Sequence, residues 1–284
     1  MNGTALLAAY CGVILLASVA GGWLPLVLRP THIRLQTYLS FASGVMLGAA
    51  MCHMLPEAAQ RAGDVWFFWT LAGLLGLFFL ERFFAFHHHE MPQENGQDAH
   101  AATDHSHGTE QQTHEHCDHP HHSLGQSSLT WWAAVVGLSV HTLAGGFALA
   151  AAVAADEGRK PGVIGFGVFL ATVLHKPADS LTITSLMISG GARRVIAHVV
   201  NLLFALAIPL GATMFYVVRE FQSRLDLTPA NFTGAALAFS AGTFLSIALG
   251  DLMPELQFHR HDRVKLSLAL LAGVAVMVVA VLVE

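Results

Sequence analysis

Two histidines and an aspartate in apolar surroundings have the residue types and the spacing of a metal site. The stretch ATVLHKPADSLTI (171–183) places His175 and Asp179 four residues apart, so a helix presents both on one face. A second histidine, His141, lies at a comparable depth in the preceding apolar run. Imidazole nitrogens and carboxylate oxygens are ligands of zinc and related divalent ions. We therefore predict that these three residues bind a divalent metal.

Two further residues of the same stretch alter its backbone and its charge. Pro177 lacks an N–H group and crowds the preceding turn, so it should leave the carbonyl of Val173 without its helical donor. Freed backbone of this kind is tolerated in a membrane where it is buried in protein or lines a cavity. Lys176 precedes Asp179 by three residues and is expected to pair with it. A packing role for each histidine is the simpler alternative.

The composition indicates the elements that must position these residues. Of 284 residues, 54% are apolar and only 12% are charged. A membrane-spanning helix needs about 20 predominantly apolar residues. The first candidate run lacks the basic start and the cleavage site of a signal peptide. We predict an all-α polytopic membrane protein with eight spans, at about 5–28, 36–57, 65–86, 129–155, 162–188, 194–219, 231–255 and 264–283.

The distribution of Lys and Arg between loops predicts the orientation. With both termini outside, the cytosolic loops would hold eight Lys or Arg residues and the outer loops five. This excess favours outward termini and places the long loop 87–128 in the cytosol.

That loop has a composition suited to metal capture. Residues 87–122 contain eleven histidines and seven carboxylates but no Lys or Arg. Such a segment cannot bury a core and is expected to be disordered. We predict weak, dynamic chelation, with a polar linker as the alternative. The histidines chosen as metal-capture residues are His114, His116, His119, His121 and His122.

An internal repeat links two distant spans. FASGVMLGAAMCHMLPE (41–57) and FSAGTFLSIALGDLMPE (239–255) share Phe, Gly, Leu, Pro and Glu at one constant offset. They occupy the second and seventh spans, which cross the membrane in opposite directions, as in the inverted repeats of many transporters. The alternative to a true repeat is chance similarity between two apolar helices. The alternative for the polar residues is that His53 is an interfacial residue and that Glu57 and Glu255 are solvated helix ends. The matched polar positions predicted to line the pathway are His53 with Asp251 and Glu57 with Glu255.

As an ensemble, these features resemble the ZIP (Zrt-, Irt-like protein) divalent-metal transporters. That family has eight spans, outward termini and a His-rich cytosolic loop between the third and fourth spans. Its fourth span carries a histidine followed by asparagine and often, four residues on, an acid. Its fifth span carries His-Glu, a proline and an acid four residues after the histidine. The resemblance covers the chain outside the loop, including AIPLGA (207–212) in the sixth span.

The resemblance implies a three-two-three arrangement with a central metal site. The parts would be helices 1–3 (1–86), the loop (87–128), the metal-binding pair (129–188) and the inverted repeat (189–284). His141, His175 and Asp179 would hold one ion, with the thioether of Met46 as a further ligand or as plain core. A second ion is disfavoured, because its family ligands are replaced by Thr142, Gly145 and Lys176. The lysine ammonium would then stand in for the second metal.

The resemblance also implies import of Zn²⁺, or of Fe²⁺, Mn²⁺ or Cd²⁺, into the cytosol by elevator-like alternating access. The metal is a substrate, and no cofactor and no enzymatic activity are expected. The partners expected are divalent ions and the lipid bilayer, with a homodimer as an option and no nucleic acid. The short loops favour the cell membrane of a bacterium. A cation-exporting antiporter with a His-rich loop and an intramembrane zinc hydrolase are the alternatives.

Overall fold

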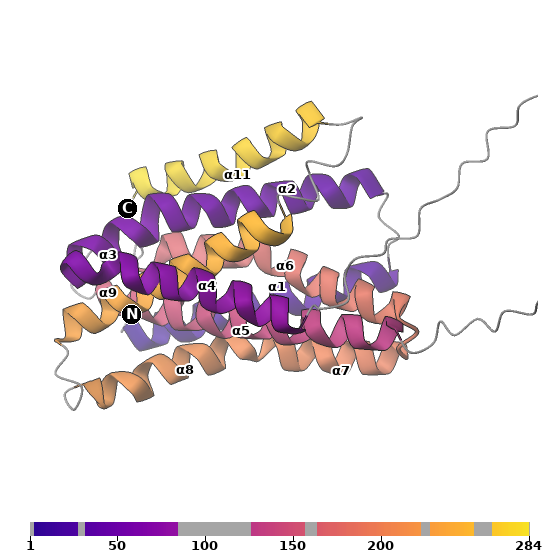
Figure 1. Cartoon of the computed structure of the whole chain (residues 1–284), viewed down its shortest axis with the longest axis horizontal. Coiled ribbons are helices and arrows are strands. Elements are labelled where there is room, and N and C mark those ends of the chain that lie inside the picture. Colours follow the sequence, from indigo (N-terminus) through magenta and orange to yellow (C-terminus); the bar gives the residue numbers. More distant parts are fainter. Residues whose placement is uncertain are drawn as a thin grey trace, which may run out of the picture.

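The structure is a computed structural model that describes residues 3–27, 32–84, 126–156, 164–222, 228–252 and 263–283. Every regular element in these ranges is a helix, which agrees with the predicted all-α class. The helices run lengthwise beside one another, and the start of α1 and the end of α11 lie at the same end of the molecule (Figure 1). In chain order the main helices are α1 (Gly3–Val27), α2 (His32–Gly48), α3 (Leu55–Ala62), α4 (Trp66–Phe84), α5 (Gln126–Ala155), α6 (Phe166–Ser189), α7 (Arg194–Ala205), α8 (Ala207–Glu220), α9 (Pro229–Ile247) and α11 (Arg263–Val283).

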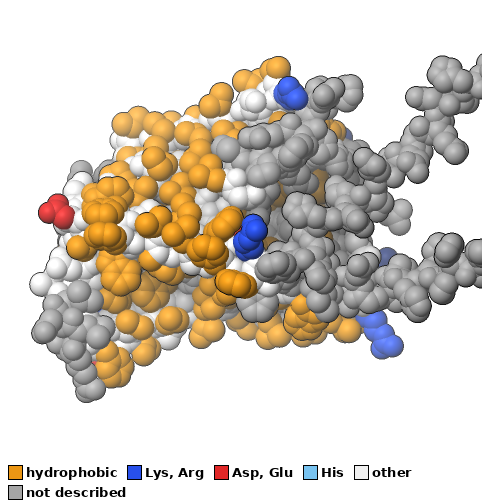
Figure 2. Space-filling view, in the orientation of Figure 1, with side chains coloured by type: hydrophobic (Ala, Val, Ile, Leu, Met, Phe, Trp, Pro, Cys, Tyr) orange, Lys and Arg blue, Asp and Glu red, His pale blue; other side chains and the backbone are white. Residues whose placement is uncertain are grey.

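Six helical stretches in the described residues combine the length and the apolarity needed to cross a membrane. One of them, Ile33–Phe83, is 51 residues long. It contains the predicted span 36–57 and most of the predicted span 65–86. Helix α6 is not among the six, since it carries Lys176 and Asp179 in its middle. Many large hydrophobic side chains are exposed, and they cover much of the described surface on the face drawn in Figure 2. The fold is therefore that of a helical membrane protein.

Several helices depart from the regular form that periodicity predicts. The second predicted span is interrupted by a π-helical segment, η1 (Ala49–Met54), and a 3-10 turn at Gly63–Val65 leads into α4. The seventh contains a π-helical segment as well, η4 (Ala248–Leu252), at the matching place in the repeat. The sixth is divided into α7 and α8 at Leu206, because Pro209 in the first turn of α8 cannot donate a helical hydrogen bond.

Four helix pairs pack against each other most extensively: α2 with α11, α4 with α9, α1 with α6, and α5 with α8. Glycines allow backbones to meet at these crossings. A Cβ on Gly44 of α2 would come within 2.0 Å of the carbonyl oxygen of Leu270 in α11. A Cβ on Gly242 of α9 would come within 2.1 Å of the carbonyl oxygen of Thr70 in α4. Gly44 and Gly242 are equivalent in the sequence repeat, so the repeated motif makes the same kind of crossing in both halves.

Candidate metal site

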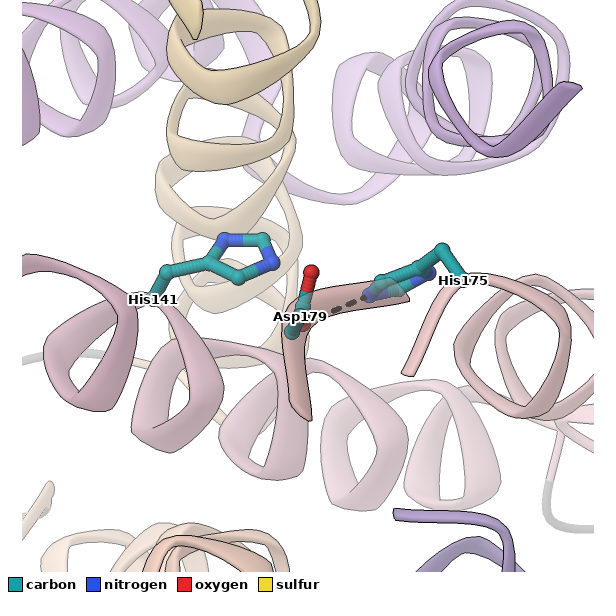
Figure 3. Close-up of side chains that lie close together, drawn as sticks. All are labelled: His141, His175 and Asp179. Atoms are coloured by element: carbon teal, nitrogen blue, oxygen red, sulfur yellow. Dashed lines mark ion pairs between the residues drawn. The ribbon is translucent and has the colours of Figure 1, made fainter. Parts of the chain in front are cut away.

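Helices α5 and α6 bring the three predicted ligands together in the interior. His141 comes from α5, and His175 and Asp179 come from successive turns of α6 (Figure 3). One ligand atom from each residue lies within 4.8 Å of the others. All three side chains are buried, with relative exposures of 1% for His141, 2% for His175 and 5% for Asp179. Within the described residues this is the one cluster of three His, Cys, Asp or Glu side chains spaced to hold a metal ion.

The two imidazoles are prepared for metal binding in different ways. His175 Nδ1 lies 2.7 Å from the carbonyl oxygen of Ala171, which fixes the proton on Nδ1 and leaves the Nε2 lone pair for a metal. Nε2 of the same ring lies 3.9 Å from Asp179 Oδ2. His141 is different, because both of its ring nitrogens are buried without a hydrogen-bond partner among the described residues. A buried polar atom without a partner costs about 1–3 kcal/mol, and a bound metal would remove that cost for the one nitrogen that ligates it.

The geometry fits a tetrahedral ion with small adjustments. Zinc bonds of about 2.0–2.2 Å separate neighbouring ligand atoms by about 3.4 Å. The present separations of up to 4.8 Å exceed this spacing by up to about 1.4 Å, so a bound ion would require an adjustment of that size. Two imidazoles and one carboxylate form a ligand set that zinc accepts readily. These donors leave a fourth position for water or for another side chain.

Lys176 is fully buried beside this cluster. Its Nζ lies 2.5 Å from Thr142 Oγ1 and 3.3 Å from Asp179 Oδ2. The ammonium also lies 3.6 Å from the centre of the Phe204 ring, close enough for a cation–π contact. A charge that is removed from water in this way needs such partners. The expected pairing of Lys176 with Asp179 is present.

Aromatic residues around the site are the group that sequence reasoning missed. The Phe244 ring of α9 packs against both imidazoles, with ring centroids 5.1 Å from His141 and 5.3 Å from His175. Phe204 of α7 covers Lys176. Tyr38 of α2 donates from its hydroxyl to the carbonyl of Leu174, 2.9 Å away, one residue before His175. Only Phe244 carried a signal, because it lies within the repeated motif.

The backbone at Pro177 is held by α1. Helix α6 continues through Pro177. A Cβ on Gly21 would come within 2.5 Å of Pro177 Cα, so this glycine lets α1 lie directly against the proline. The hydroxyls of Ser18 and Ser180 are 2.7 Å apart at the same crossing. These contacts fix the turn of α6 that carries the predicted ligands.

The residues predicted as substitutes for second-ion ligands also lie at the site. Thr142 donates to the carbonyl of Leu138 and accepts from Lys176, so its hydroxyl is engaged. Gly145 faces Ile208 and Phe244 at ordinary van der Waals distance. The neighbouring Gly146 makes the close helix approach at this point, since a Cβ there would lie 2.1 Å from the Ile208 oxygen. Met46 is buried in the same apolar cluster as Phe244.

None of the predicted pathway residues belongs to the ligand cluster in the described part of the chain. His53 is partly exposed in η1, and Glu57 in α3 forms an ion pair with Arg61, with Nε and Oε1 2.5 Å apart. Asp251 belongs to η4, and only the backbone of this residue is described. Glu255 and the five metal-capture histidines of the loop lie outside the described residues. Their roles stay predictions.

Comparison with known proteins places the chain among metal transporters. The family described as ZIP zinc transporter matches residues 5–280. Zinc transporter ZIP9-B of Xenopus laevis is 26% identical over 278 residues, which cover 88% of this chain and 84% of that protein.

Two other zinc transporters share parts of the sequence. Zinc transporter ZIP9 of Xenopus tropicalis is 34% identical over 127 residues, covering 45% of this chain and 41% of that protein. Zinc transporter ZIP13 of Homo sapiens is 27% identical over 290 residues, covering 93% of this chain and 72% of that protein. With a family match over nearly the whole chain, this integral membrane protein belongs to the ZIP zinc transporter family.

Proposed function

We propose that this protein carries one divalent metal ion at a time, zinc by preference, through the site of His141, His175 and Asp179. The observation that carries the proposal is the buried cluster itself, with its unpartnered His141 ring and its lysine. The alternative is a zinc hydrolase, in which the same ligands would hold a permanently bound catalytic zinc. The relatives favour transport, because they are named as zinc transporters.

The position of Lys176 supports a single ion. Two divalent ions about 4 Å apart repel each other by about 17 kcal/mol at an effective dielectric constant of 20. Extra carboxylates would have to offset this repulsion. Here Asp179 is the one carboxylate within the described ligand cluster, and Lys176 already adds a positive charge 3.3 Å from it. The ammonium therefore serves in place of a second metal.

The helix pairs support an eight-span, three-two-three arrangement with two moving parts. Helices α1, α5, α6 and α8 are joined by the α1–α6, α5–α8 and α5–α6 contacts, and they include both ligand-bearing helices. Helices α2, α4, α9 and α11 are joined by the α2–α11 and α4–α9 contacts and by a smaller α2–α9 contact. In the proposed mechanism the first group slides against the second and exposes the metal to each side in turn.

We propose import into the cytosol, and the charged ends support the orientation that goes with it, in which both termini are outside. On the face drawn in Figure 2, Lys and Arg side chains lie toward the end where α2, α7 and α11 begin, and an acidic side chain lies at the opposite end. The positive-inside rule makes the basic end cytosolic. The described cations at that end are Arg34, Arg82, Arg193, Arg194, Arg263 and Lys265, against Arg61 and Arg219 at the other.

The test is zinc uptake by purified protein in vesicles, with pH and membrane potential controlled. His141→Ala, His175→Ala and Asp179→Ala each remove one ligand, and loss of a supporting partner of a metal ligand already costs about 10–100-fold. We expect each variant to lose at least tenfold in uptake. His198→Ala is the matched control, because His198 contacts Trp23 in α1 and lies outside the ligand cluster. Near-normal uptake by all three ligand variants would place the pathway elsewhere.

A further inference from the structure

A cavity of about 460 Å³ lies between the first turns of α2 and α11, away from the metal site. Its mouth carries Arg34 and Lys265, the third residues of the two helices. Both side chains are exposed, so both are free to turn toward a ligand at the mouth. The other lining residues are Thr37, Tyr38, Phe41 and Ala269.

The charges at this cavity are the reverse of what isolated helices favour. A helix N-terminus carries about half a positive charge and is stabilised by nearby acids. The described first turns of α2 and α11 contain no acid and instead carry Arg34, Arg263 and Lys265. Two helix dipoles and these cations therefore point positive charge at one place. An anion bound there would relieve this repulsion.

The extent of the cavity lining along the two helices favours a lipid over a free anion. Phe41 lies seven residues beyond Arg34, which is about 10 Å along a helix. The lining of this open cavity thus has a cationic part at the helix starts and an apolar part further along, at Phe41 and Ala269. A free phosphate needs no such apolar part, whereas a phospholipid places its phosphate at the surface and its chains below it. Basic pockets between membrane helices bind anionic lipid headgroups in this way.

We propose that this cavity binds the headgroup of one anionic phospholipid of the membrane, with Arg34 and Lys265 holding its phosphate. The hydroxyls nearby are engaged inside the protein, since Thr37 donates to Ile33 and Tyr38 donates to Leu174. The two cations are therefore the binding groups. Tyr38 also connects the cavity to the turn of α6 before His175, so the lipid would lie beside a contact that supports the metal site.

The experiment is native mass spectrometry of the detergent-purified full chain titrated with phosphatidylglycerol or phosphatidylcholine. We expect one phosphatidylglycerol to bind tightly and phosphatidylcholine to bind much more weakly. Each cation near a lipid surface contributes about 1 kcal/mol, so Arg34→Gln with Lys265→Gln should weaken binding about 30-fold. Arg82→Gln is the matched control, because Arg82 is an exposed cation near the same end that does not line the cavity. It should leave binding unchanged.

Three results would overturn the proposal. Equal binding of the two lipids would show that charge is not recognised, and wild-type binding by the double variant would show that the cavity is not the site. Complete displacement of the lipid by millimolar inorganic phosphate would identify a site for free anions. If the double variant does not give a monodisperse sample, the single variants replace it, and each should weaken binding about fivefold.

Discussion

At the scale of single residues, the site combines three metal ligands, His141, His175 and Asp179, with the ammonium group of Lys176. His175 is oriented through the Ala171 carbonyl, while neither ring nitrogen of His141 has a hydrogen-bond partner in the described part of the chain. Lys176 has three contacts, which are Thr142, Asp179 and the face of Phe204. The charge of the site is thus balanced before any metal arrives, and an incoming ion must compete with the lysine for Asp179.

Changing this lysine should change the number of bound ions. Lys176→Glu replaces a cation by a carboxylate and removes a repulsion of about 8 kcal/mol between an ammonium and a divalent ion 4 Å away. We expect one zinc per chain in the wild type and two in this variant, measured by anomalous scattering at the zinc edge. Lys176→Gln is the control that removes the charge without adding a ligand, and it should bind one. Two well-occupied ions in the wild-type centre would contradict the role given to Lys176.

At the scale of elements, glycines determine how closely the ligand-bearing helices approach their neighbours. Gly146 of α5 and Gly211 of α8 lie at one crossing, where an added Cβ would meet the opposite backbone at 2.1 Å in either case. Gly21 has the same role between α1 and α6. Helix α5 therefore packs closely against α8, and α6 packs closely against α1. These contacts help to determine where the ligands on α5 and α6 lie.

Two adjacent glycines of α5 offer a direct comparison. Gly146→Ala should force α5 and α8 apart and destabilise the protein by about 1–3 kcal/mol, the usual cost of overpacking. Gly145→Ala adds a Cβ that meets Ile208 and Phe244 at an ordinary 3.8 Å, and alanine favours the helix by up to about 1 kcal/mol. Thermal unfolding in detergent should therefore show a lower midpoint for the first variant only. Equal midpoints would mean that the crossing relaxes freely.

At the scale of the whole molecule, the two halves use one packing scheme. The α2–α11 and α4–α9 crossings are related through the repeated motif, and a π-helical segment lies within that motif in both halves. π-Helical turns often occur at functional sites. The predicted pathway residues His53 and Asp251 belong to these two segments. The His-rich segment lies between α4 and α5 in the chain, outside the described residues.

Deleting residues 90–122 should therefore leave the transport core intact. The segment cannot bury a core of its own, so the described helices should fold without it. We expect a normal elution profile and a zinc uptake rate close to wild type in vesicles, with weaker zinc retention by the purified protein. A variant of the same length with the loop histidines replaced by serine separates chelation from tether length. Failure of the deletion variant to fold would show that the segment is structural.

The sequence by itself determined the features that depend on local geometry. A spacing of four residues on a helix places His175 and Asp179 together, and a spacing of three brings Lys176 to Asp179, whatever the rest of the fold does. Long apolar runs likewise predicted the helices, because length and apolarity are properties of each segment. The repeat predicted that Gly44 and Gly242 are equivalent, and both lie at close crossings.

Only the tertiary structure decided which helices meet. Apolar helix surfaces look alike in sequence, so nothing local identified Phe204 as the partner of Lys176 or Phe244 as the ring that packs against both imidazoles. The approach of α5 to α6 adds His141 to the ligand set, and each of these helices also meets another helix at a glycine far away in the chain, α5 with α8 at Gly146 and α6 with α1 at Gly21. Metal binding therefore rests on a local pattern in α6 that becomes a site when close packing supplies the residues from other helices.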